Sequence, residues 1–523
     1  MNCISTEPQY FEDLTPIQSL YTKDASNEYS ADSGLFSGNS KDQFFKNPIT
    51  SLPIWAEGDV DKYYAYYAYH EVTRLDRLIL NIANYFGIII HGKKTQIELD
   101  SHLKCFDIQK LLIEGPYENP ILSTTAQMLI YDNLNDIEKV YDIHLHNLGF
   151  DEDNFLNPKA SAFGVATHLD YIKFSLLRYA CGITSPQGST NEARKRLYLY
   201  ASHFPKLIGV VLPFHKAILG DGKVDWDNTG SYISNHTVLK TAGRFESLSS
   251  ELLPATSIHP LDPQWREKLF RAHAKGIRLV KWVPPQSIKP DTPLFDNFYR
   301  MMKQLDMTLI AHVGPEHTIP TTESTRIWVD WGNPLRFRKP LKLGVNVILS
   351  HCGHKDLIPD LDHPQRILVP GYQLYIRLAR EAHQKNLKGE WKGKLYGDLA
   401  AVTTHYGPEF IRELLLLANE DGFRLIYGSD YPYTNLIKPR NDAYTTCSKA
   451  GLVDPRYVKP LQEIREWNPL LANYIFTRVL EFQRIDGEKI RFPKSIFNGE
   501  YEGAKLKLID PVMWLQHKEC SVF

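Results

Sequence analysis

The sequence predicts an α/β protein: a (β/α)8 TIM barrel with an N-terminal helical extension and a short C-terminal tail. Two observations indicate this class. After residue 138, short apolar runs alternate with longer amphipathic stretches, and there are eight such runs. Eight strands, each followed by a helical crossover, close naturally into a barrel, although an open doubly wound sheet would satisfy the same alternation. A barrel takes roughly 250 residues, so a chain of 523 residues has room for one barrel and large additions.

The expected strands can be placed by their apolar runs. Their ranges are 140–144, 206–213, 252–259, 276–283, 307–312, 344–351, 394–401 and 423–430. Helical periodicity appears between them at 262–275, 293–305, 372–385 and 408–421, and 469–480 is the expected closing helix.

The chain divides into four expected parts. Residues 1–47 are polar, rich in Ser, Asn and Asp, and show no sustained period, so they are expected to be disordered or loosely packed. Residues 48–138 carry helical periodicity from about residue 58 and predict a helical extension. The barrel is expected over 139–480, and 481–523 form a less regular tail.

Composition and charge exclude several classes of partner. A net charge of −1 gives no reason to expect nucleic acid or an anionic membrane as a partner. The apolar stretch 78–90 is too short to span a bilayer, and no signal peptide is expected. Composition and net charge are also compatible with a homo-oligomer.

Cysteine usage indicates a cytoplasmic protein. Six cysteines are scattered without regular spacing, which fits reduced thiols rather than a disulfide framework. The last four residues, beginning at Cys520, match a prenylation box of the C-a-a-X type. Chance is the better explanation for this match, because little basic charge precedes it.

Polar residues fall where buried strands should end in apolar ones. His144 and His146 close the first expected strand, and His312, His351 and Asp430 close the fifth, sixth and eighth. Side chains two apart on a strand point to the same side, and all five lie at the C-terminal strand ends, where barrel active sites form. An unpaired imidazole or carboxylate there would cost several kcal/mol. A shared cation would offset that cost.

Imidazole nitrogens with one carboxylate suit a divalent metal. Zinc is the first expectation, and Mn²⁺, Fe²⁺ or Co²⁺ are the alternatives. Each residue alone is more often structural than functional. The order HxH, His, His, Asp at the strand ends makes the set a strong indication of one metal site.

Several segments also resemble a known family. They are DIHLH at 142–146, GIRLVKWVPP at 276–285, LIAHVG at 309–314, VILSHCG at 347–353 and YGSDYPY at 427–433. Over about 140–480 the chain is similar to the amidohydrolase superfamily, most closely its amidohydrolase-2 branch. That branch includes aminocarboxymuconate-semialdehyde decarboxylase and related decarboxylases and hydrolases.

The resemblance implies a role for each strand-end residue. His144, His146 and His312 would be neutral imidazole ligands, and Asp430 would be the fourth ligand or the group that takes the proton of the metal-bound water. The metal would lower the pKa of that water to ~7. His351 would act as general acid/base or polarise the substrate carbonyl, unless it is a structural core histidine.

The resemblance leaves other positions open. Lys281 stands where two-metal members carry a carbamylated lysine; with one metal it would contact a metal ligand, bind a substrate anion, or have neither role. Loop position alone assigns five residues to the pocket: Trp282, Glu316, His317, His354 and Tyr431. Family decarboxylases often carry a histidine after the fourth strand, whereas this chain has VPP at 283–285.

Three functions fit these observations. The first is a metal-dependent hydrolase of a small-molecule amide, ester or lactone. The second is a non-oxidative decarboxylase on the same metal site. The third is an inert barrel that serves as a binding module. Fold and ligands are shared by all three, so the sequence does not separate them.

Overall fold

The protein is seen here in a computed structural model. It describes residues 74–85, 88–92, 94–149, 151, 154–157, 175–184, 188–315, 330–436, 442–501 and 504–505. The expectations for residues 1–47, Glu316, His317 and Cys520 fall outside the described residues.

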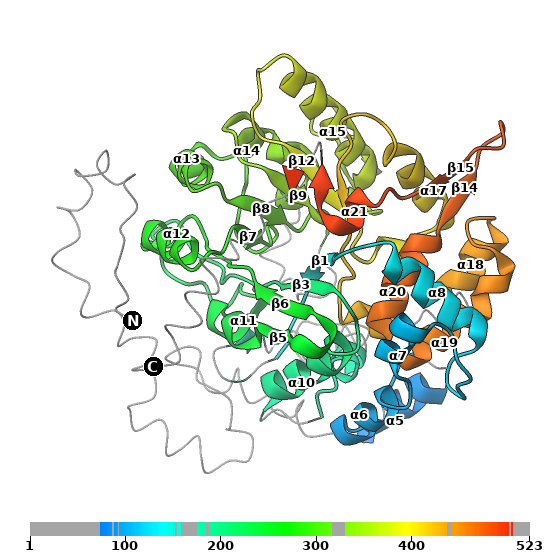
Figure 1. The fold of residues 1–523 in the computed structure, drawn as a ribbon. Helices are drawn as coiled ribbons and strands as arrows, with labels where there is room; N and C mark the ends of the chain where they lie inside the picture. Colours follow the sequence, from blue (N-terminus) through cyan, green and yellow to red (C-terminus); the bar gives the residue numbers. More distant parts are fainter. Residues whose placement is uncertain are drawn as a thin grey trace, which may run out of the picture.

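Eight parallel strands form the centre of the molecule (Figure 1). They are β1 (Val140–Leu145), β3 (Leu207–Val211), β6 (Ser250–Pro254), β7 (Leu279–Trp282), β8 (Thr308–Ala311), β9 (Val347–Leu349), β12 (Leu395–Asp398) and β13 (Leu425–Ile426). Each overlaps one of the eight expected strands, so the predicted barrel class is confirmed.

The ring of strands is joined at two seams. Continuous ladders give the orders β1-β3-β6-β5, where β5 is Gly243–Phe245, and β13-β12-β9-β8-β7, so the strands do not form one unbroken sheet. A single parallel bridge, Thr256 to Val280, joins β6 to β7, and another, Leu145 to Tyr431, joins β1 to the chain after β13. At the second seam the Asp430 amide donates to the His144 carbonyl over 2.9 Å.

Alternate strand side chains face the interior of the ring. Residues from seven of the strands, with Leu212 just after β3 and Ala255 just after β6, form one apolar cluster there: Ile143, Val210, Leu212, Ala255, Leu279, Ile310, Ile348, Tyr396 and Ile426. Because strand side chains alternate with period two, the next interior positions toward the C-terminal ends are polar. They are Lys281, His312, Ser350 and Asp398, each two residues beyond an interior apolar residue. The strand pattern therefore directs polar side chains into one mouth.

Helices cover the outside of the ring. Those within or next to the expected ranges are α12 (Trp265–Ala274), α13 (Asp296–Gln304), α15 (Gly371–Leu387), α17 (Pro408–Leu417) and α20 (Pro469–Val479). Their apolar faces and the outward strand side chains form the large core. This layer fixes where each strand ends.

The described N-terminal helices pack beside the last barrel helices (Figure 1). They are α5 (Arg74–Tyr85), α6 (Gln96–Leu103), α7 (Ile108–Glu114) and α8 (Thr124–Asn135), and they lie near α19 (Val458–Trp467) and α20. A capping box between Thr95 and Glu98 starts α6. The indole of Trp467 donates to the Leu103 carbonyl over 2.9 Å, which ties α6 to the barrel side.

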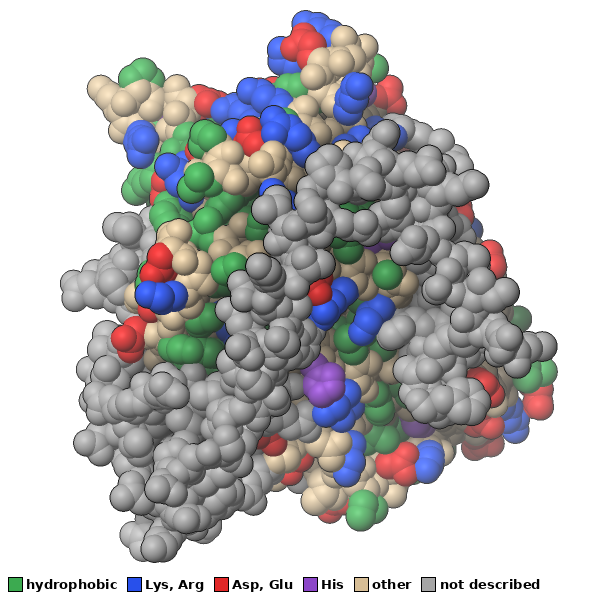
Figure 2. All heavy atoms as spheres, turned by 90° about the vertical axis from the view of Figure 1, so that its left-hand side faces the viewer, with side chains coloured by type: hydrophobic (Ala, Val, Ile, Leu, Met, Phe, Trp, Pro, Cys, Tyr) green, Lys and Arg blue, Asp and Glu red, His purple; other side chains and the backbone are tan. Residues whose placement is uncertain are grey.

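Shorter elements complete the described chain. They are β2 (Phe155–Leu156), α10 (Ser189–Ala201), β4 (Ser231–Tyr232), α11 (Asn235–Thr241), β5 (Gly243–Phe245), α14 (Arg338–Lys342), β10 (Leu357–Pro359), β11 (Leu368–Pro370), α16 (Val402–His405), α18 (Ala443–Lys449), β14 (Glu481–Gln483), β15 (Lys489–Arg491), α21 (Ser495–Asn498), β16 (Glu500–Tyr501) and β17 (Ala504–Lys505). Within the described ranges no helix has the length and apolar character that a bilayer crossing needs. Acidic and basic side chains are interspersed on the face shown in Figure 2.

Candidate metal centre

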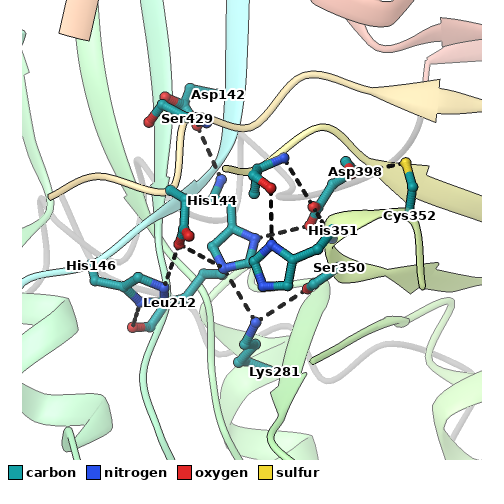
Figure 3. Close-up of polar contacts among 12 residues, drawn as sticks. Asp142, His144, His146, Leu212, Lys281, Ser350, His351, Cys352, Asp398 and Ser429 are labelled. Atoms are coloured by element: carbon teal, nitrogen blue, oxygen red, sulfur yellow. Dashed lines mark hydrogen bonds and ion pairs between the residues drawn. The ribbon is translucent and has the colours of Figure 1, made fainter. Parts of the chain in front are cut away.

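Three buried side chains meet at the mouth of the barrel (Figure 3). One ligand atom each of His144, His146 and Asp430 lies within 4.8 Å of the other two. Asp430 Oδ1 is 3.6 Å from His144 Nε2 and 3.5 Å from His146 Nε2. Two imidazole nitrogens and a carboxylate oxygen suit zinc and related divalent ions, so the donors present fit a metal.

An irregularity in β1 aims the two histidines. Asp142 pairs with Gly209 and Leu145 pairs with Val211, so β1 has one residue more than β3 between these pairs. Such a bulge turns the following side chains, and bulges are common next to active sites. It brings His144 to the mouth although its neighbour Ile143 belongs to the interior apolar cluster.

The seam between β1 and β13 brings Asp430 opposite the histidines. Asp142 Oδ1 accepts from the amides of His144 (3.2 Å) and Ser429 (3.0 Å), so one carboxylate holds both strand ends. A Cβ at Gly428 would lie only 2.9 Å from the Cβ of His144. Glycine therefore makes room for this ligand. Asp430 itself has a φ of 61°, in the left-handed region.

Each histidine of the cluster has its other nitrogen occupied. Nδ1 of His144 lies 2.8 Å from Asp398 Oδ2, and since a carboxylate accepts, the ring donates there. Nδ1 of His146 lies 3.5 Å from the carbonyl of Leu212. These contacts leave the Nε2 lone pairs directed at the centre, as metal-binding histidines require.

The protonation states also suit a metal site. Burial, together with the charge of Lys281, lowers the pKa of His144 to about 3, so the ring is neutral. Burial alone would raise the pKa of Asp430, but its contacts with the His146 and His144 rings outweigh burial and hold that pKa well below its usual value. Neutral imidazole and ionised carboxylate are the forms that bind metal.

His351 stands next to the cluster. Its ring centre is 5.4 Å from that of His144 and 5.1 Å from that of His312. Nδ1 lies 2.9 Å from the carbonyl of Ala400, so it donates a proton and Nε2 is left to exchange one. The residue lies in a short 3-10 turn with a φ of 58°.

His312 does not belong to the three-residue cluster. It was expected to be the third imidazole ligand, but its Nε2 lies 3.4 Å from the carbonyl of Pro315, in the turn that follows β8. Its ring centre lies 5.1 Å from that of His351, so His312 is next to the site although it is outside the group of three.

Lys281 points into the same space (Figure 3). Its Nζ is 3.4 Å from His144 Nε2 and 3.3 Å from Ser350 Oγ, and the residue is buried. An ammonium group there uses the lone pair that a metal would also use. A metal cation and the Lys281 ammonium group would therefore compete for Nε2 of His144. The lysine side chain is flexible, so it is the group that can move away.

Two expected pocket residues lie elsewhere. The Trp282 indole donates to the Ile258 carbonyl over 2.8 Å, and its ring packs 5.3 Å from that of Phe298, in the layer between strands and helices. The Tyr431 ring packs on Tyr200, 6.1 Å away. Strand alternation explains both, since each follows an inward-facing residue. Both rings therefore pack in the large apolar core rather than in the cluster of His144, His146 and Asp430.

His354 keeps a place at the mouth. Its ring is 6.2 Å from that of His351 and 5.6 Å from that of Tyr406, in the loop after β12. Burial and the nearby Asp430 raise the pKa of Tyr406 well above its usual value, so it stays protonated. Tyr406 was not expected from the sequence, because only the fold brings its loop beside His354.

Two histidines in the segments that follow β3 and β6 are structural. His215 Nε2 accepts from the Val283 amide, and His259 Nδ1 accepts from the Leu261 amide, each over 3.0 Å. Their other nitrogens lie 3.0 Å from Lys216 O and from Ser287 Oγ. With both nitrogens used, these rings join loops rather than bind a ligand.

Comparison with known proteins gives one family match. Residues 260–454 match the family model described as amidohydrolase. No curated protein matches the chain.

Two solved structures cover 65% of this chain. One, from Acinetobacter baumannii with citric acid bound, is named as a probable 2-pyrone-4,6-dicarboxylic acid hydrolase; it is 14% identical, is covered over 99% of its length and has a TM-score of 0.30. The other, from Pseudomonas putida, bears the same enzyme name; it is 12% identical, 98% covered and has a TM-score of 0.26. At these TM-scores neither structure adds to the assignment. The family match over 260–454 supports an enzyme of the amidohydrolase type, in the amidohydrolase-2 branch.

Proposed function

We propose that this enzyme is a metal-dependent hydrolase of a small-molecule amide, ester or lactone. The observation that carries the proposal is the buried cluster of His144, His146 and Asp430, with His351 beside it. One divalent ion, Zn²⁺ first, would be held by these three side chains. His312, whose Nε2 now lies 3.4 Å from the Pro315 carbonyl, would be a further ligand.

The chain's own residues would divide the work of hydrolysis. A divalent ion, when bound, supplies Lewis-acid chemistry, which lowers the pKa of water and polarises a carbonyl. Asp430, ionised and buried, is placed to take a proton from the attacking water. His351 Nε2 is placed to give a proton to the leaving group, because Nδ1 is fixed on Ala400.

Lys281 supports a second candidate, a non-oxidative decarboxylase. A buried ammonium group 3.4 Å from a ligand histidine could pair with a substrate carboxylate. In that reaction His351 would protonate the product carbon. The VPP segment at 283–285, where family decarboxylases often have histidine, favours hydrolysis.

Two product assays separate the candidates. Zinc-loaded protein is offered a panel of lactones, esters and amides and a panel of aromatic and unsaturated carboxylic acids. Acid release is followed by titration and carbon dioxide by trapping. We expect acid release alone, and a His351→Ala variant that retains its zinc but is about 10²- to 10⁴-fold slower in kcat. Carbon dioxide without acid release would favour the decarboxylase.

A further inference from the structure

One buried carboxylate, that of Asp398, contacts both His144 of the metal cluster and His351 beside it. Asp398 ends β12 and is fully buried. Its Oδ2 accepts from Nδ1 of His144 over 2.8 Å, and its Oδ1 accepts from the backbone amide of His351 over 2.7 Å (Figure 3). The two histidines come from strands on different sides of Asp398 in the ring.

The contact with His351 is reinforced through Ala400. Asp398 Oδ1 also accepts from the Ala400 amide over 3.2 Å, and the Ala400 carbonyl accepts from Nδ1 of His351 over 2.9 Å. His351 is thus held at two points. Its backbone amide donates to Asp398, and its ring donates to the carbonyl of Ala400. This matters because His351 has a φ of 58°, a conformation that residues with a Cβ rarely adopt.

The turn that carries His351 sits directly on β12. The Cys352 thiol donates to the Asp398 carbonyl over 3.0 Å. A Cβ at Gly397 would lie 3.0 Å from that sulfur and would collide with the Tyr375 hydroxyl. Glycine before Asp398 therefore allows the close approach that the carboxylate needs.

We propose that Asp398 is a positioning residue that sets the tautomer of His144 and the location of His351 together. This inference rests on the proposed function, because it assigns His144 to metal binding and His351 to proton transfer. One carboxylate would then couple metal affinity to acid/base geometry. Carboxylate partners of metal-binding histidines fix the ring and its tautomer.

Asp398→Asn tests this coupling with almost no change in size. An amide has one accepting oxygen and one donating NH₂. If the oxygen stays with the His351 amide, the NH₂ faces Nδ1 of His144, whose proton must then move to Nε2, the metal-binding atom. If the amide turns over, the His351 turn loses its acceptor. In either orientation the side chain of the Asp398→Asn variant loses one of the two contacts, either that with Nδ1 of His144 or that with the backbone amide of His351.

The first measurement is zinc affinity by competition with a chromophoric chelator. We expect Asp398→Asn to bind zinc about 10- to 100-fold more weakly than the wild type. The matched control is Asp360→Asn, because Asp360 is also a buried carboxylate but pairs with Arg377 over 2.6 Å instead of with the site. We expect its zinc affinity to equal that of the wild type. Circular dichroism verifies that both variants are folded.

The second measurement is made on metal-free protein, and its wild-type arm does not depend on a variant folding. Histidine ¹⁵N NMR should show His144 protonated at Nδ1, and in Asp398→Asn that proton or the slow exchange of the His351 amide should be lost. A wild-type His144 protonated at Nε2, or a folded Asp398→Asn with unchanged zinc affinity and tautomer, would overturn the role of Asp398. A wild type that binds no zinc while keeping the Nδ1 tautomer would contradict the proposed function and leave the positioning role standing.

Discussion

Asp142 places an acidic group in the most buried part of the site. It is fully buried, and only its Oδ1 has hydrogen-bond partners within the described chain; Oδ2 has none there. Burial raises its pKa to about 7. Because the folded pKa lies above the ordinary value of 3.8, the folded protein holds this proton more tightly than the unfolded chain. Its contribution to stability is therefore greatest at low pH and falls as the pH rises towards 7.

Asp142→Asn should remove this pH dependence. The amide oxygen can still accept from the amides of His144 and Ser429, and no charge is buried at high pH. Relative to the variant, the wild type should lose roughly 2–3 kcal/mol of unfolding free energy between pH 5 and pH 8. Urea unfolding with chelator present at both pH values measures this, and a constant difference between the two proteins would show that Asp142 is charged throughout.

Strand-end position predicts ligands only in part. His144, His146 and Asp430 were singled out by this rule and lie together, but His312 was singled out by the same rule and lies outside their cluster. His259 also closes an expected strand, yet its two ring nitrogens contact the Leu261 amide and the Ser287 hydroxyl. The contacts that a ring makes depend on loops far away in the sequence. Asp398 could have been noticed as a charge inside the apolar run 394–401, but its partners follow only from the spatial order of the strands.

At the scale of elements, the seam between β1 and β13 is where the site is assembled. The strands meet there through a bridge at Leu145 and Tyr431 rather than through a long ladder. Gly428 lies at this seam, against the Cβ of His144. A small residue there allows the two ligand-bearing segments to approach.

Gly428→Ala should therefore weaken both the fold and the metal site. The added methyl group must push His144 aside, and overpacking of this kind costs about 1–3 kcal/mol of unfolding free energy. Zinc affinity should fall with it. Gly407→Ala is the matched control, because a Cβ at Gly407 meets nothing within 4 Å. Urea unfolding and zinc titration of both variants check this, and equal results for the two would mean that the seam tolerates the methyl group.

Alternation of apolar runs and helices predicted all eight strands, because hydrophobic period reports burial directly. The bulge in β1 and the two single-bridge seams were not predictable in this way. They arise from the way neighbouring strands pair, and the period of hydrophobic side chains along one strand carries no information about that pairing. The outward positions of Trp282 and Tyr431 illustrate the same limit, since loop position alone does not say which face a residue takes.

At the scale of the whole molecule, the N-terminal helices and the barrel share one core. Leu99 and Leu103 of α6 and Leu111 of α7 belong to the same apolar cluster as Trp467 and Leu470. The sequence predicted helices here but not the elements they pack against. An apolar stripe shows that one face of a helix is buried, but it does not identify the surface that buries it. The packing places these helices against α19 and α20, on the outside of the ring.

The central claim is that distant strand ends share one cation, and metal content with affinity tests it most directly. Purified wild type should bind one equivalent of zinc. His144→Ala and Asp430→Asn should lose it, by about 10- to 100-fold in affinity or more. His312→Ala should have a smaller effect, because His312 lies outside the three-residue cluster. Equal zinc content in the wild type, His144→Ala and Asp430→Asn, or none in the wild type, would contradict the account.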